Sequence, residues 1–113
     1  MLLPSTLSAP EAAAVHEFIA RARSMLGAEL KEARLFGSRA RGAGHEYSDL
    51  DIAVIVSNGS RGRRHALYDL AFDVGVAHGV ELAPVVFEER QLQELRERER
   101  RIALDIDREG IPL

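Results

Sequence analysis

The chain has 113 residues, which is enough for one compact domain with a modest core but not for two. Its formal net charge of −3 gives no global basic field that would attract nucleic acid, and the absence of cysteine excludes disulfides and thiolate metal sites. The sequence has no signal-peptide pattern and no apolar run of the ~18 residues that span a membrane. We therefore expect one domain over residues 1–113 in a cytoplasmic protein, without direct contact to nucleic acid or membrane.

The first predicted element is an amphipathic helix over residues 9–26. Ser8 and Glu11 have the spacing of a capping box, in which each residue satisfies a backbone N–H near the other. Gly27 is a suitable end point for the helix. The apolar residues that recur on one helical face are Val15, Phe18, Ile19, Ala22 and Met25.

The rest of the chain alternates between β-branched runs and segments with helical periodicity. Pro84 indicates that the last predicted strand is an edge strand or contains a bulge. This order predicts an α/β (α+β) fold in which helices pack on a small mixed β-sheet. The expected elements are a strand at 33–36, a loop at 40–47, a central strand at 50–56, a helix at 63–78, a strand at 80–87 and a charged helix at 88–101.

Two aspartates interrupt the start of the central strand, in the sequence SDLDIAVIV. Because side chains alternate along a strand, Asp49 and Asp51 should share one face while Leu50 and Ile52 point to the other. Two like charges on one face repel each other, and a hard cation such as Mg²⁺ would hold them together. The alternative is that both carboxylates are solvated at the entrance of the strand and have only a structural role.

The loop before these aspartates, GSRARGAG, has the composition of an anion-binding turn. Gly37 allows close approach of the backbone to a ligand, and Ser38 supplies a hydroxyl donor. Arg39 and Arg41 add guanidinium groups that bind phosphate well. A glycine-rich turn with solvated arginines is the alternative, and for this loop taken alone it is the better interpretation.

The loop and the aspartates together form a far more specific pattern than either alone. Gly37-Ser38, ten further residues and Asp49-Leu50-Asp51 match the signature GSx10DxD. In this, the chain resembles the DNA polymerase β-like nucleotidyltransferase superfamily, and most of all its minimal (MNT-type) members, which are often encoded beside a HEPN-domain partner. The resemblance extends to the leading helix, both strands that flank the loop, and the closing segment RRIALDIDREGIPL.

The resemblance implies a role for each residue of the motif. Gly37 and Ser38 would bind the triphosphate, and Arg39 and Arg41 are expected to add phosphate contacts. Asp49 and Asp51 would be the catalytic ligands of two Mg²⁺ ions. Glu81, in the strand VELAPVVF, is the candidate third metal ligand and catalytic carboxylate, with an exposed strand carboxylate as an equal alternative.

The resemblance also implies a reaction. We expect transfer of AMP from ATP to a hydroxyl group, with a tyrosine of a partner HEPN toxin as acceptor and an antitoxin role for this chain. One alternative is a catalytically weak nucleotide-binding antitoxin that acts by complex formation. Another is a small-molecule (antibiotic) nucleotidyltransferase that works as an oligomer.

Several polar residues outside the motif are interpreted without a catalytic role. His45 is expected to be a solvated loop residue, and Tyr47 is expected to pack against the loop rather than on a base. Asp69 and Asp73 are four residues apart on a predicted helix and should be solvated.

Overall fold

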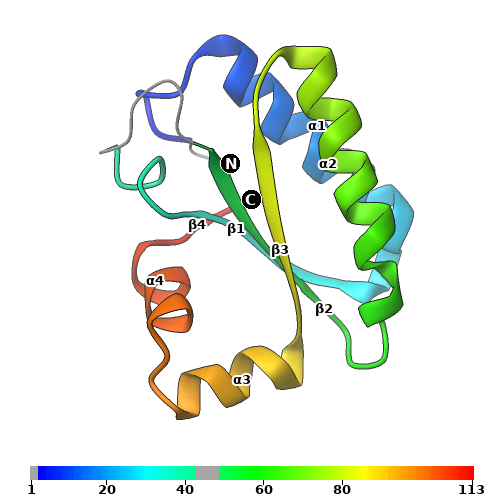
Figure 1. The fold of residues 1–113 in the computed structure, drawn as a ribbon, viewed down its shortest axis with the longest axis vertical. Coiled ribbons are helices and arrows are strands. Elements are labelled where there is room, and N and C mark those ends of the chain that lie inside the picture. Colours follow the sequence, from blue (N-terminus) through cyan, green and yellow to red (C-terminus); the bar gives the residue numbers. More distant parts are fainter. Residues whose placement is uncertain (1–2, 43–48) are drawn as a thin grey trace.

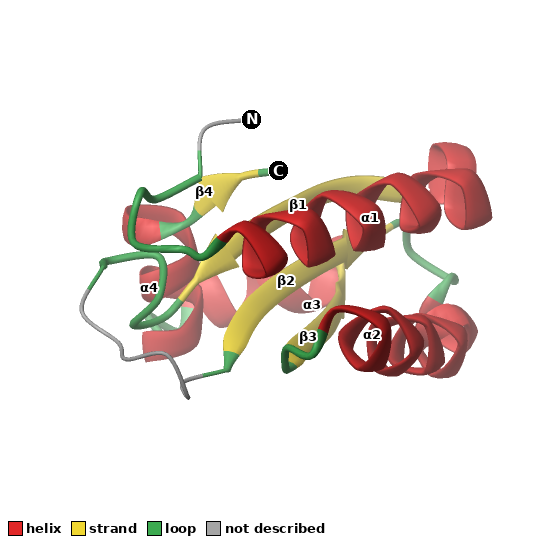
Figure 2. Cartoon of the chain, turned by 90° about the horizontal axis from the view of Figure 1, so that it is seen from above, coloured by secondary structure: helices red, strands yellow, loops and turns green. Residues whose placement is uncertain are grey.

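The computed structural model describes residues 3–42 and 49–113. A four-stranded mixed sheet runs through the middle of the molecule, and helices cover both of its faces (Figures 1 and 2). No helix within the described ranges is long and apolar enough to cross a membrane. The elements are α1 (Ala9–Leu26), β1 (Leu30–Phe36), β2 (Leu50–Val56), α2 (Arg64–His78), β3 (Leu82–Glu88), α3 (Glu89–Glu97), α4 (Arg101–Glu109) and β4 (Ile111–Pro112), with short 3-10 turns at Gly27–Glu29 and Arg61–Arg63.

The order of strands in the sheet is β3-β2-β1-β4. Strand β1 is antiparallel to both β2 and β4, whereas β2 and β3 are parallel. The prediction that residues 50–56 form a central strand is confirmed, and so is the prediction from Pro84, since β3 lies at an edge of the sheet. The mixed sheet with its helical layers confirms the expected α/β class.

Helix α1 has the bounds that its capping signals predict. The backbone N–H of Glu11 donates to Ser8 Oγ at 3.2 Å, and the N–H of Ser8 donates to Glu11 Oε1 at 2.7 Å. The helix ends at Gly27, which has a φ of +54°. The helix therefore begins and ends at its local sequence signals.

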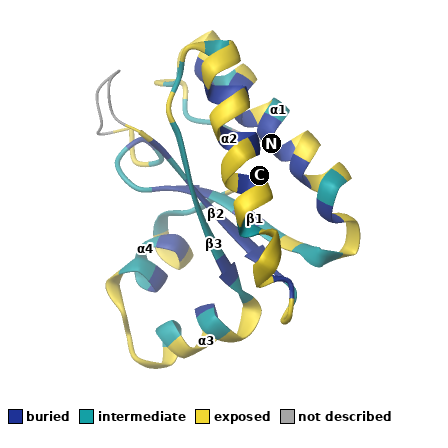
Figure 3. Cartoon of the chain, turned by 45° about the vertical axis from the view of Figure 1, so that its right-hand side comes forward, coloured by how far each residue is buried: buried dark blue, intermediate teal, exposed yellow. Residues whose placement is uncertain are grey.

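Strand β2 is buried on both faces, which explains its nearly unbroken apolar sequence (Figure 3). On one face, residues such as Ile52 and Val54 pack against α1 and α2, with Phe18 fully buried among them. On the other face, Ala53 and Ile55 pack against α3 and α4. Two cores thus hold β2 in a fixed position, and the residues at its start are fixed with it.

Several elements differ from the prediction. Strand β1 begins at Leu30, three residues earlier than expected, and β3 begins at Leu82, so Glu81 lies just before the strand and not in it. The charged segment 88–101 is not one helix, because the chain leaves α3 at Arg98 and Glu99 has a left-handed φ of +52°. This turn lets α4 place Ala103 and Ile106 in the core beside β2. Strand β4 has only two residues, too few to show any period, and was not predicted.

Candidate nucleotide and metal site

The candidate site lies where β1 ends beside the start of β2. Phe36 pairs with Asp51 across these antiparallel strands, so Gly37 comes directly next to the aspartates. Gly37 has a φ of +79°, and a Cβ atom built on it would overlap Asp51 Oδ2. Only glycine fits this position without strain or displacement, because the backbone is left-handed and the carboxylate occupies the space of a side chain. The loop and the aspartate motif are thus in direct contact at Gly37 and Asp51.

The electrostatics of the two aspartates suit a cation. Asp49 is exposed just before β2, and Asp51 is half-buried at its second residue. Burial, and secondly the negative charge of Asp49, raise the pKa of Asp51 above its ordinary value. A divalent cation would offset both effects, and carboxylate oxygens are the ligands that Mg²⁺ prefers. The donor set present here therefore fits Mg²⁺.

The loop after Gly37 consists of successive turns. The N–H groups of Ala40 and Arg41 donate to the carbonyl of Gly37 at 3.2 and 3.3 Å, and the N–H of Gly42 donates to the carbonyl of Arg39 at 3.3 Å. Ser38 lies in the first of these turns and is partly exposed. The turns give residues 37–42 a compact shape without forming a helix.

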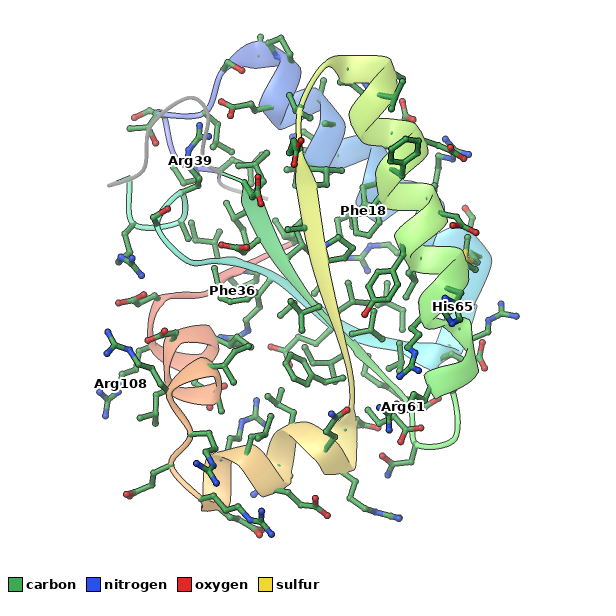
Figure 4. The ribbon with its side chains drawn as sticks, viewed as in Figure 1. Phe18, Phe36, Arg39, Arg61, His65 and Arg108 are labelled. Atoms are coloured by element: carbon green, nitrogen blue, oxygen red, sulfur yellow. The ribbon has the colours of Figure 1, made fainter. Side chains whose placement is uncertain are left out.

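Arg39 is buried and bound to Glu11 of α1. Its Nη1 and Nη2 lie 2.7 Å from Glu11 Oε2 and Oε1, and the two side chains are only 4 % and 10 % exposed. The hydrogen bond from Arg39, with further contributions from Ser8, lowers the pKa of Glu11 although burial acts in the opposite direction. Arg39 therefore anchors the loop to the first turn of α1 (Figure 4), and its contact with phosphate stays a prediction.

Arg41 is exposed and connects the same loop to α4. Its Nη1 lies 2.7 Å from Glu109 Oε2, and both side chains keep a third or more of their surface in solvent. A phosphate contact would need only this surface pair to open, and it too stays a prediction. The loop is thus attached to α1 on one side and to α4 on the other.

Glu81 lies at the same end of the sheet as the aspartates. Its carbonyl accepts the N–H of Leu50 at 3.0 Å, and the parallel register continues with Asp51 opposite Ala83. Its side chain is exposed. Within residues 3–42 and 49–113, however, no three His, Cys, Asp or Glu side chains are gathered closely enough to hold a metal ion. The role of Glu81 as third ligand therefore stays a prediction, and His45 and Tyr47 lie outside the described residues.

Glu11 is the residue near this site that sequence reasoning did not connect to it. It was predicted only as a helix cap, whereas it also holds Arg39. The two residues are 28 positions apart, and no local spacing indicates such a pair.

Comparisons with known proteins agree with this architecture. The model of the family "Nucleotidyltransferase domain" matches residues 15–106. A Methanocaldococcus jannaschii protein named "Putative protein adenylyltransferase" is 37% identical over 79 residues, which are 67% of this chain and 54% of that protein. The chain thus spans about half the length of this curated relative.

Two solved structures are similar along most of the chain. One, described as a "putative minimal nucleotidyltransferase", is 27% identical with a TM-score of 0.57, and the match covers 97% of this chain and 100% of the other. The second is a toxin–antitoxin crystallised with AMP-PNP, with 24% identity, a TM-score of 0.52, and coverage of 85% and 69%. It shows similarity of fold. Since the family model spans most of the sequence and the fold agrees, this chain belongs to the nucleotidyltransferase domain family.

Proposed function

We propose that this chain binds Mg²⁺-ATP at its Gly37–Asp51 site and transfers AMP to a protein hydroxyl. We further propose that the acceptor is a tyrosine of a partner HEPN toxin, for which this chain acts as the antitoxin. The main support for a nucleotide site is the packing of Gly37 against the Asp51 carboxylate. This contact joins the turn proposed to bind phosphate to a carboxylate proposed to bind metal.

The proposed reaction assigns a different role to the loop and to the two aspartates. The turn at Gly37 and Ser38 would hold the triphosphate, and Asp49 and Asp51 would hold the metal ions that bind its phosphates. The acceptor oxygen forms a bond to the α-phosphorus, the bond from that phosphorus to the β-phosphate oxygen breaks, and pyrophosphate leaves while the hydroxyl proton passes to solvent. Asp49 and Asp51 would hold the Mg²⁺ ions, which when bound would supply positive charge beside the acceptor oxygen and the leaving pyrophosphate.

The choice of a protein acceptor is supported by the relatives. The Methanocaldococcus jannaschii protein carries the name of a protein adenylyltransferase. A second toxin–antitoxin structure, a mutant of the pair MntA-HpeT, has the same fold as this chain at 22% identity, with a TM-score of 0.52. The first name favours a protein substrate over a small molecule, and the second shows that this fold occurs in a toxin–antitoxin pair.

A second candidate function is a nucleotide-binding antitoxin that neutralises its partner by contact alone. It is favoured by the absence of a three-carboxylate cluster among the described residues. With only Asp49 and Asp51 as ligands, nucleotide would still bind while transfer became slow.

The test uses ATP labelled at the α-phosphate, Mg²⁺, the purified protein and a lysate of its host. The Asp49→Asn, Asp51→Asn double variant runs beside the wild type. The matched control is the Glu94→Gln, Glu97→Gln double variant, which removes two exposed carboxylates from α3.

Each outcome of this assay has one interpretation. A labelled protein band with the wild type and the control, but not with the aspartate variant, is the expected result. Nucleotide binding without any labelled product would establish the contact antitoxin instead. A labelled small molecule without a labelled protein would establish a small-molecule transferase.

A further inference from the structure

Helix α2 carries a row of apolar side chains on its solvent side. Among the residues that the structure describes, the exposed large apolar side chains are Tyr68, Phe72 and Val76, which are 40 %, 72 % and 67 % exposed. They are spaced four residues apart, so they form one line along the helix, which we call the α2 stripe. The outward side of α2 is correspondingly exposed in Figure 3. Contiguous exposed apolar side chains of this size mark interaction surfaces.

A hollow of about 500 Å³ lies beside the α2 stripe. Phe72 and Val76 form one wall, and the segment from Gly79 to Leu82 forms the other. Gly75 brings the helix close to this segment, because a Cβ there would lie 2.6 Å from the carbonyl oxygen of Val80. The stripe is therefore one side of a groove and not only a convex ridge.

The groove leads to the candidate site. Glu81 lines it, and the carbonyl of Glu81 accepts the N–H of Leu50, the residue between the two aspartates. A protein segment lying along the groove would therefore reach the end of the sheet at which Asp49 and Asp51 lie. Because side chains alternate along β2, the two aspartates belong to the face of Ala53 and Ile55, so the segment would continue around the edge strand β3 to bring a hydroxyl to them.

Charge indicates the chemistry of the occupant. Asp69 and Asp73 are exposed on α2 next to the stripe, and neither forms an ion pair with any described residue. Glu81 adds a third exposed carboxylate at the end of the groove. A second copy paired through a two-fold axis at Phe72 would bring Asp69 and Asp73 opposite their own counterparts, whereas a basic partner would complement them.

We propose that the α2 stripe is the docking surface for the acceptor protein of the reaction, and this rests on the function proposed above. The acceptor lays an amphipathic helix into the groove, with an apolar row on Phe72 and Val76 and with arginine or lysine side chains opposite Asp69 and Asp73. The stripe thereby selects the acceptor, while the Gly37–Asp51 site binds the nucleotide.

The experiment uses the acceptor identified by labelling, purified, as the probe. The Phe72→Ser, Val76→Ser variant removes the apolar contact at two exposed positions, and the Asp69→Lys, Asp73→Lys variant reverses the charge. The matched control is Glu94→Lys, Glu97→Lys on α3. For each protein, the KM for the acceptor is compared with the Kd for Mg²⁺-ATP, and thermal melting checks that the variant is folded.

We expect the KM for the acceptor to rise about tenfold or more in both α2 variants, because exposed aromatic anchors often dominate binding. The Kd for Mg²⁺-ATP should be unchanged in both α2 variants, and the control variant should keep the wild-type KM and Kd. An unchanged KM in folded α2 variants overturns the docking surface but leaves the proposed function intact. A wild type that labels no protein overturns the proposed function and the docking surface with it. A wild-type dimer that becomes monomeric on Phe72→Ser, Val76→Ser assigns the stripe to a second copy and also overturns the proposal.

Discussion

The buried ion pair between Arg39 and Glu11 makes a quantitative prediction about stability. Arg39→Ala leaves the Glu11 carboxylate buried without its guanidinium partner, and breaking a buried pair in this way typically costs about 3–5 kcal/mol. The control is Arg41→Ala, which removes a half-exposed pair with Glu109 and should cost about 1 kcal/mol or less. The two variants change the same residue type in the same loop, so burial is the main difference between them.

The assay is urea unfolding at neutral pH, with thermal melting as a second measurement. At about 4 °C per kcal/mol for a domain of this size, Arg39→Ala should lower the Tm by roughly 12 °C or more. The pH dependence has a definite sign, because the pKa of Glu11 lies below its ordinary value of 4.5 in the folded protein. The stabilisation by this pair is complete above that value and is lost as the pH falls through the lower, folded pKa. The difference in free energy of unfolding between the wild type and Arg39→Ala should therefore become smaller in acid.

Equal losses for Arg39→Ala and Arg41→Ala would refute this reasoning. The Glu11→Leu, Arg39→Met double variant gives a further check, because replacing both members of the pair by apolar side chains leaves neither charge buried alone and should recover much of the stability. Its affinity for Mg²⁺-ATP then tests the predicted phosphate contact. Retained affinity would assign Arg39 to holding the loop, whereas a loss of about tenfold or more would support contact with the nucleotide.

Two further predictions concern the contact between the loop and the aspartates. Gly37→Ala should weaken Mg²⁺-ATP binding, measured by calorimetric titration, because the new methyl group displaces the Asp51 carboxylate. The control is Gly59→Ala, at a φ of +91° with open space around it. This change should cost about 1–2 kcal/mol of stability and leave Mg²⁺-ATP binding unchanged. Asp51→Asn should raise the Tm of the metal-free protein at neutral pH, because burial and Asp49 raise the pKa of Asp51 and so disfavour its charged form in the fold. That gain should disappear as the pH falls below the ordinary value of 3.8, where the carboxyl is protonated in both states, and a gain that persists in acid would contradict this explanation.

The elements that sequence reasoning predicted well are those with local physical causes. The bounds of α1 follow from Ser8, Glu11 and Gly27, which act within one helical turn of each end. Strand β2 was predictable because a short run rich in β-branched residues is typical of a strand that is buried on both faces. The spacing of the motif predicted that Gly37 and Asp51 belong to one site. The structure brings these two residues together and gives the reason why a glycine is needed there, while their binding roles stay predictions.

What the sequence did not reveal depends on contacts between distant segments. Arg39 was predicted as a phosphate ligand from its place in the loop, whereas its ion pair is with a helix residue 28 positions away. The break between α3 and α4 occurs at Glu99, within a charged run that contains neither glycine nor proline, so no breaker residue indicated it. Strand β4 exists because β1 offers a free edge at Arg34 and Leu35, and the two residues of β4 carry no signal of their own.

The attachment of one loop to both α1 and α4 has a consequence for synthesis of the protein. The ribosome makes α1 and residues 37–42 first, but Glu109, the partner of Arg41, follows 68 residues later. Leu113, whose N–H donates to the carbonyl of Ala33 at 2.9 Å beside the same strand, is made later still. During synthesis the loop at residues 37–42 can therefore be anchored to α1 before Glu109 exists, and its surface attachment to α4 is completed last.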